Sequence, residues 1–225
     1  MRITITDSSL LRLMQFSSAS LPVGAYAFSQ GLESAVEFSW IKNQDETFEW
    51  LHTQISQSLV YVDLPILFRM MSAIQGEDNK AIAYWNDYLI ACRETQELVL
   101  SDIAPGEALQ RLLKNLGENP VTTNVANPTF ILGFAYAATM WNISNEAAAL
   151  GYLWSWLENQ VAAATKLVPL GQTQAQRLLS ELQTDLAAHI EHAQKIEDED
   201  IGSSLPALAI VSALHETQYS RLFRS

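Results

Sequence analysis

Two pairs of side chains have a spacing that could bind a divalent metal ion. Glu49 and His52 show the Glu-x-x-His spacing of carboxylate-bridged dimetal bundles, in which both side chains project from one helical face. Such a bundle needs a second motif of this kind, and the sequence contains none. His189 and His192 lie three residues apart, so on a helix they could share an ion. Two imidazoles alone make a weak site, and a helical metal-binding protein is kept as the alternative function.

Motifs for covalent or nucleotide chemistry are missing from the sequence. There is no Gly-x-Ser-x-Gly turn for a serine nucleophile, and the single cysteine, Cys92, has no catalytic motif around it. Nothing reads Gly-x-x-x-x-Gly-Lys, the loop that binds nucleotide phosphates. We therefore predict that the chain is not an enzyme and needs no cofactor.

The proportions of residue types indicate a globular protein that does not bind nucleic acid. Hydrophobic residues make up 48% of the 225 residues and charged residues 17%, which is enough for an ordinary core. The 13 Lys and Arg residues against 25 Asp and Glu residues give a formal net charge of -12. Binding to phosphates needs clustered basic side chains, so nucleic acid is excluded and a basic or metal-loaded partner is favoured.

No segment is expected to insert into a membrane or to direct the chain out of the cell. The N-terminus lacks a basic region followed by an apolar run. The longest apolar stretches, residues 130–141 and 147–157, are shorter than the roughly 20 residues that cross a bilayer. One cysteine cannot form an intramolecular disulfide, which fits a reducing compartment. We expect a cytoplasmic protein without membrane contact.

Helix signals dominate, and only residues 2–6 could form a strand. Capping residues and prolines mark the expected helix starts: Ser8, Asn43 or Asp45, Pro105, Asn127 with Pro128, Ser144, and Ser204 with Pro206. Pro65 should divide a helix over residues 46–71 near Asp63, because proline lacks the N–H that a helix interior needs. The other long helices are expected over residues 26–38, 80–100, 105–117, 144–166 and 172–194. We predict an all-α, single-domain bundle of about eight to ten helices over residues 1–225.

The C-terminal segment, residues 215–225, combines apolar and basic side chains in an otherwise acidic chain. Tyr219, Leu222 and Phe223 are typical interface anchors, and Arg221 and Arg224 can donate paired hydrogen bonds to carboxylates. We name residues 215–225 the docking tail. Composition alone leaves two interpretations open, namely that the tail binds a partner or that it packs on the core of its own chain.

Three blocks of sequence resemble, in order, the signature segments of one protein family. They are LPVGAYAFSQGLE at residues 21–33, KLVPLGQTQAQR at residues 166–177 and HETQYSRLFRS at residues 215–225. Because they span nearly the whole chain, the sequence is identified as a member of the UreF family of urease accessory proteins. Ala27 and Phe28 depart from the family pattern, in which Ser and Tyr are common, so we expect no polar recognition there.

The resemblance implies an all-α, non-catalytic protein that commonly forms a homodimer. Members of the family join an accessory protein of the UreD (UreH) type and a GTPase of the UreG type, and this assembly acts on apo-urease during nickel insertion. The family's C-terminal segment is associated with docking to the UreD-type protein. That contact is therefore expected to involve five residues of the docking tail: Tyr219, Arg221, Leu222, Phe223 and Arg224.

The resemblance also implies residues for contact with the GTPase. Tyr26 and Glu33 lie in the first block, where tyrosine can supply contact area with a hydroxyl and glutamate can accept charge-assisted hydrogen bonds. The same block could instead only pack and cap one helix. A second set flanks a predicted helix break near residues 169–171 and could form an interface or an internal support: Lys166, Gln172 and Arg177.

A sharper alternative makes the chain an activator of GTP hydrolysis. An arginine inserted into the nucleotide site of a GTPase stabilises the transition-state charge. Four arginines are candidates for this role: Arg93, Arg177, Arg221 and Arg224. Regulating GTP hydrolysis does not require such a residue, so a binding factor remains the main expectation.

Overall fold

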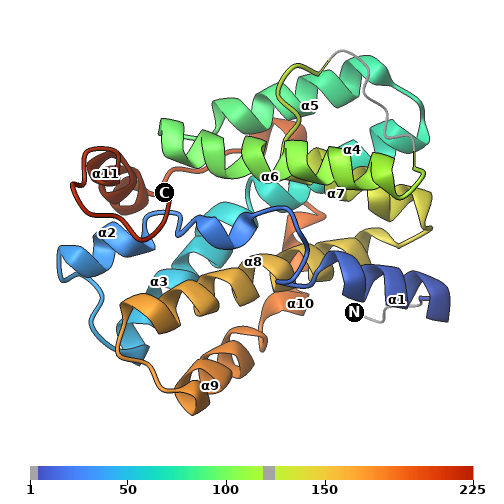
Figure 1. The fold of residues 1–225 in the computed structure, drawn as a ribbon. Coiled ribbons are helices and arrows are strands. Elements are labelled where there is room, and N and C mark those ends of the chain that lie inside the picture. The colour runs from blue at the N-terminus through green and yellow to red at the C-terminus, as the bar shows by residue number, and fades with distance from the viewer. Residues whose placement is uncertain (1–4, 119–124, 225) are drawn as a thin grey trace.

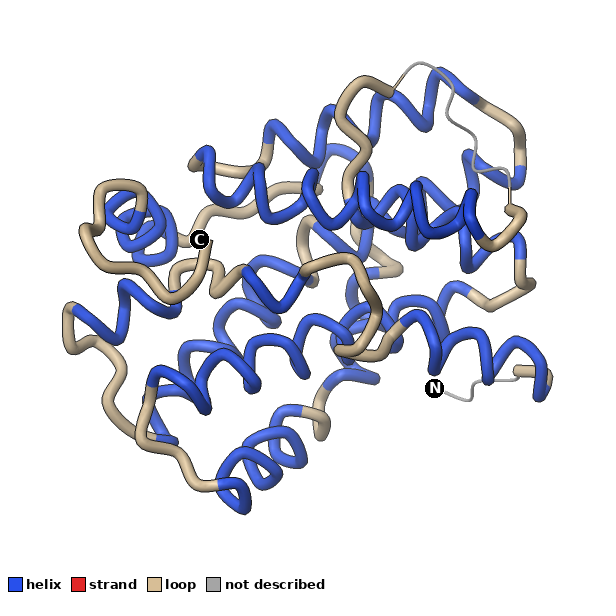
Figure 2. The backbone as a smooth tube through the Cα atoms, in the orientation of Figure 1, coloured by secondary structure: helices blue, strands red, loops and turns tan. Residues whose placement is uncertain are grey.

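All regular secondary structure is helical in the computed structural model, which describes residues 5–118 and 125–224 (Figures 1 and 2). The α-helices of this part of the chain are α1 (Asp7–Phe16), α2 (Leu32–Glu37), α3 (Gln44–Gln54), α4 (Asp63–Gln75), α5 (Asn79–Ala91), α6 (Gln96–Asn115), α7 (Phe130–Met140), α8 (Asn145–Leu167), α9 (Gln172–Leu182), α10 (Leu186–Ala193) and α11 (Pro206–His215). Three short elements complete the set: the 3-10 helices η1 (Ala25–Ala27) and η3 (Asp198–Asp200), and the π-helix η2 (Ile55–Leu59).

The all-α class is confirmed, and the described residues hold eleven α-helices. The number exceeds the expected eight to ten because residues 172–194 form two helices, α9 and α10, separated by a turn. The first expected long helix is also shorter, since residues 25–27 form η1 and the α-helix begins only at Leu32. The possible strand over residues 2–6 lies mostly outside the described residues, and residues 5 and 6 are not in a strand.

Short polar side chains cap most helix starts, and two expected caps are correct. Asn43 accepts from the backbone N–H of Glu46 at 3.0 Å and Ser144 from that of Ala147 at 3.3 Å. The prediction of Ser8 was wrong by two residues, because Thr6 caps α1. Asn127 and Pro128 do not start α7 either, because Thr129 is its cap. Pro206 begins α11 as expected, although no side chain caps this helix.

Prolines have different effects at two positions in the chain. Pro65 lies in the first turn of α4, and the division expected near Asp63 is confirmed, with η2 and a turn before it. Pro105 lies inside α6, so the prediction that it starts a helix was wrong. The break falls instead before Thr95, whose side chain accepts from the backbone N–H of Leu98 at 3.2 Å and caps α6.

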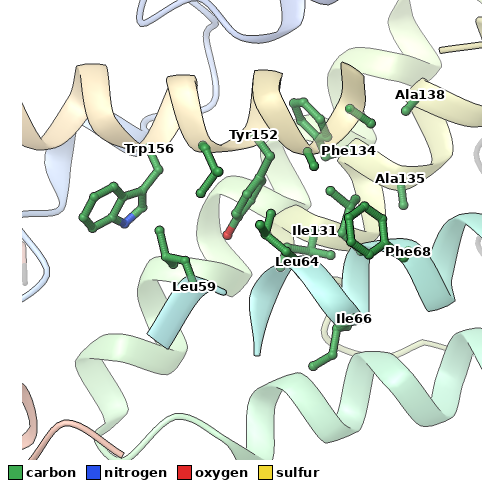
Figure 3. Packing of buried hydrophobic residues seen from close by; sticks show 14 of the residues in the cluster. Leu59, Leu64, Ile66, Phe68, Ile131, Phe134, Ala135, Ala138, Tyr152 and Trp156 are labelled. Atoms are coloured by element: carbon green, nitrogen blue, oxygen red, sulfur yellow. The ribbon is translucent and has the colours of Figure 1, made fainter. Parts of the chain in front are cut away.

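The core is built around α4, α7 and α8, which cross in the middle of the molecule (Figure 1). Figure 3 shows Tyr152 and Trp156 pointing from α8 toward Leu59 and Leu64, with Phe134 of α7 nearby. A second, smaller cluster joins α2, the end of α8, α11 and the docking tail: Leu32, Ala35, Ile41, Ala163, Ala164, Val168, Val211 and Phe223. No helix among the described residues is both long and apolar enough to cross a bilayer.

We expect Gly106→Ala to destabilise the fold, because α6 passes directly over the segment that leads into α7. A Cβ atom at Gly106 would lie 2.1 Å from the backbone oxygen of Pro128 and 2.4 Å from the backbone carbon of Thr129. Overpacking of this kind costs about 1–3 kcal/mol. Urea unfolding should show a loss of about 2 kcal/mol, while the control Gly76→Ala, whose Cβ has room, should be unchanged or slightly more stable. Equal stability of the two variants would contradict this packing.

Candidate partner-docking site

The docking tail is bound to its own chain through backbone hydrogen bonds. The carboxylate of Glu33, in the first turn of α2, accepts from the backbone N–H of Leu222 at 2.6 Å and of Phe223 at 2.8 Å. The backbone N–H of Arg224 donates to the carbonyl oxygen of Ala27 in η1 at 2.8 Å. Figure 1 shows the C-terminus close to α2 and to the end of α11. The end of the tail, residues 222–224, is therefore an ordered segment held against η1 and α2.

A buried histidine links the start of the tail to the same carboxylate. His215 has no exposed surface, and its Nδ1 lies 2.8 Å from Glu97 Oε2 while its Nε2 lies 3.2 Å from Glu33 Oε2. Arg221 donates to the other oxygen of Glu97 at 3.0 Å. Burial raises the pKa of Glu97, against the lowering effect of His215 and Arg221. A neutral imidazole carries one N–H, so both histidine contacts are hydrogen bonds only if one further proton resides in this cluster.

At the end of the tail, Phe223 is buried between exposed neighbours. Phe223 is only 6% exposed and packs in the smaller hydrophobic cluster, where the Lys166 ammonium lies 5.4 Å from its ring centroid. Tyr219 is fully exposed and Leu222 is 64% exposed. These two side chains therefore contribute little to the packing of their own fold.

Exposed apolar residues continue from the tail onto the neighbouring helices. Ile210 and Leu214 of α11 are 52% and 41% exposed, and Leu100 of α6 is 46% exposed. Leu100 also lines a surface depression of about 780 Å³ beside the tail, together with Gln96, Glu97, Glu216, Arg221, Phe223 and Arg224. The depression combines basic, acidic and apolar lining groups, which is the composition of many protein interfaces. We name the outward side chains of Tyr219 and Leu222, with this depression, the tail surface.

The structure brings together most of the residues that the sequence analysis singled out. Tyr26 is 62% exposed on η1, next to Ala27, which binds the tail, and Lys166 contacts Phe223. Glu33 is 7% exposed and is occupied by the tail and by His215, so its described contacts are internal. Gln172 and Arg177 lie exposed on α9, outside this set of contacts. The role of all these residues in partner binding remains a prediction.

A second buried charged cluster lies between α4, α6 and α8. Arg93 donates to Asp63 at 2.7 Å and to Asp102 at 2.6 Å, and the hydroxyl of Tyr152 donates to Asp63 at 2.7 Å. Burial opposes the charge on Arg93, but Asp102 and Asp63 outweigh it and raise the pKa of Arg93 well above its ordinary value. Both of its carboxylate partners are buried, so Arg93 is held inside the fold and is the weakest of the four candidates for insertion into a GTPase.

The cluster around Arg93 adjoins a small polar cavity. The cavity has a volume of about 40 Å³ and is lined in part by Asp63, Arg93 and Tyr152. Pockets for substrates or cofactors usually have a volume of about 300–1,000 Å³. Water is the occupant that such a space fits, and the cluster is a structural one that fixes three helices relative to one another.

The two candidate metal-binding pairs do not form a complete site. Glu49 is exposed, whereas His52 stacks on Phe48 and its ring centroid lies 6.0 Å from that of His189. His192 lies apart from them, with its Nε2 3.2 Å from the hydroxyl of Tyr61. Among the described residues, no group of three His, Cys, Asp or Glu side chains could hold a metal ion.

We expect Glu33→Ala to release the end of the tail. The change removes the acceptor of two backbone N–H groups and one partner of His215, and leaving a buried donor unpaired costs about 1–3 kcal/mol. Hydrogen exchange followed by mass spectrometry should show faster exchange in residues 218–224. Glu37→Ala, an exposed change in the same helix, is the matched control and should leave exchange unchanged. Unchanged protection in Glu33→Ala would contradict the role of this carboxylate.

Alkaline pH should destabilise the fold in part through Tyr152. Burial and the charge of Asp63 raise its pKa well above the ordinary value of 10.0, so the unfolded chain loses this proton first. The stability that Tyr152 provides is therefore complete below pH 10 and is lost as the pH rises further. Between pH 10 and 11, the free energy of unfolding measured with urea should fall by about 1 kcal/mol less for Tyr152→Phe than for the wild type. The control Tyr84→Phe, at an exposed tyrosine, should show the same pH dependence as the wild type. If Tyr152→Phe also matched the wild type, the hydroxyl of Tyr152 would ionise as freely in the folded protein as in the unfolded chain, which would contradict the prediction.

Comparison with known proteins shows the family of this chain. The family model for UreF matches residues 41–183. The urease accessory protein UreF of Marinomonas sp. (strain MWYL1) is 53% identical over 223 residues, which cover 99% of this chain and 97% of the relative. The proteins of the same name from Chromohalobacter salexigens and Alkalilimnicola ehrlichii are 47% and 48% identical, and each comparison covers at least 95% of both chains. The chain belongs to the UreF family.

Proposed function

We propose that this chain is a non-catalytic urease maturation factor that binds a UreD/UreH-type accessory protein and a UreG-type GTPase and assists nickel insertion into apo-urease. The observation that carries the proposal is the packing of three separate family-like blocks against one another. Glu33 and Ala27 of the first block bind the tail, and Lys166 of the second block lies over Phe223. Nickel is the cargo of this process and requires no resident metal site in the chain.

The tail surface is the proposed contact for the UreD-type protein. Tyrosine supplies contact area at a low entropic cost, and the backbone of Leu222 is already held by its hydrogen bond to Glu33. Arg221 and Arg224 border the adjacent depression, where they can pair with acidic groups of a partner. A partner that binds here therefore meets a preordered surface and loses less conformational entropy on binding.

The GTPase contact is proposed for Tyr26 together with the exposed residues at the start of α9. Tyr26 projects from η1 while its neighbour Ala27 accepts the hydrogen bond from Arg224, so the two proposed contacts share one short piece of backbone. Lys166, Gln172 and Arg177 supply polar and cationic groups at the end of α8 and on α9. Glu33 acts indirectly in this proposal, by holding the tail rather than by touching the GTPase.

Self-association and location complete the proposal. We propose that the chain acts as a homodimer in the cytoplasm, as the family resemblance implies. The exposed apolar face of α1, with Leu11 68% and Met14 63% exposed, supports an interface of this kind. The dimer would present two tail surfaces to the rest of the assembly, which then acts on apo-urease.

Co-purification with the cognate UreD-type protein tests the proposal. The variant Tyr219→Ala/Leu222→Asp changes two exposed side chains and leaves the inward contacts of the tail intact. Because central aromatic and apolar anchors carry most of the binding energy, we expect affinity to fall by about tenfold or more. Truncation after Leu214 is a poorer test, since it also removes His215 and Phe223 from the core.

The control for this experiment is Tyr84→Ala/Leu116→Asp, which makes the same two kinds of change at exposed residues away from the tail. It should bind the UreD-type protein like the wild type, and both variants should keep their helical circular dichroism. Equal affinity of the tail variant and the wild type would rule out the tail surface as the contact. A chain that binds neither the UreD-type protein nor the UreG-type GTPase would overturn the maturation role itself.

A further inference from the structure

An open groove runs between α3 and the start of α11. It has a volume of about 450 Å³, within the range of about 300–1,000 Å³ that is usual for binding pockets. Its apolar lining residues are Trp40, Ile41, Trp50, Leu205, Ala207 and Leu208. The groove lies at the first residues of α11, whereas the tail surface follows the last residue of that helix. It is therefore a separate surface from the one in the proposed function.

The charge on the rim of the groove has one sign. Asp45, Glu46 and Glu49 line it from α3, and its lining contains neither Lys nor Arg. Asp45 and Glu46 lie in the first turn, where the helix dipole favours negative charge, but Glu49 lies beyond that turn. Glu46 also accepts from the backbone N–H of Lys42 at 2.6 Å. Asp45 and Glu49 are exposed like charges four residues apart, which repel each other slightly and would gain from a cation between them.

Two tryptophans give the groove affinity for cationic and aliphatic groups. Trp40 is 45% exposed, a large apolar area that its own fold leaves in water. Trp50 is half-buried and lines the same groove. The faces of tryptophan rings attract Lys and Arg side chains, and the carboxylates of the rim strengthen this attraction.

We infer that this groove binds a basic, aliphatic segment of a protein partner. The aliphatic side chains of the segment pack between Trp40 and Leu208, and its Lys or Arg side chains pair with Asp45 and Glu49. Opposite charge favours such a segment over an acidic one, since like charges brought together at an interface cost several kcal/mol. The same rim disfavours a second copy of this acidic chain as the occupant.

Fluorescence polarisation with two labelled peptides tests the inference on the full-length chain. One probe is an 18-residue amphipathic helix of leucine and lysine, and the other has glutamate in place of every lysine. We expect the lysine peptide to bind and the glutamate peptide to bind at least about tenfold more weakly. Trp40→Ala and Glu49→Lys should each weaken binding of the lysine peptide by about tenfold, as expected for central interface residues.

Matched controls separate the groove from the general acidity of the chain. Glu181→Lys makes the same charge change on the exposed face of α9, and Tyr84→Ala removes an exposed aromatic side chain from α5. Both should bind the lysine peptide within about twofold of the wild type. Equal weakening by Glu181→Lys, or equal binding of both peptides, would overturn the inference. A change of oligomeric state in Trp40→Ala, measured by sedimentation velocity, would show a second copy in the groove and would overturn it as well.

Discussion

The surface that we propose for partner binding depends on one carboxylate. Glu33 accepts two backbone N–H groups from the tail and contacts His215, so three hydrogen-bonding groups converge on the first turn of a short helix. Hydrogen bonds from backbone amides hold the tail in place without using its side chains. The side chains of Tyr219 and Leu222 can therefore face solvent. The residues of the proposed interface are thus exposed beside a buried anchor, Phe223, and in this proposal changes at Glu33 act on partner binding from inside the fold.

Two buried charged clusters fix the helices on which that surface is built. One joins α4, α6 and α8 through Arg93, and the other joins α2, α6 and α11 through His215. Buried charges lose hydration, so such clusters contribute little net stability, but removing one member leaves an unpaired charge and is costly. Apolar helices can slide along one another, whereas these paired groups are satisfied in only one arrangement. We regard helix register, rather than added stability, as their main effect.

The sequence was sufficient for the helical class and for several helix starts, because caps such as Asn43 and Ser144 act within one turn. It misled at Pro105, where α6 continues, and at residues 183–185, where the apolar stripe continues across a turn. Both outcomes depend on packing against distant segments. The internal partners of Glu33 were equally out of reach, since the carboxylate and Phe223 lie 190 residues apart in the chain. Motif resemblance marked these residues as important, but only the fold shows that they bind each other.

The contact between α2 and the tail can form only late in the synthesis of residues 1–225. A ribosome makes η1 and α2 well before residues 221–224, and domains fold as the chain emerges. Glu33 therefore has no tail to bind until Leu222 and Phe223 have been made, and the smaller hydrophobic cluster lacks Phe223 until then. A chain that terminates early cannot display the finished tail surface. Presence of that surface therefore reports that the chain has been made at least as far as Phe223.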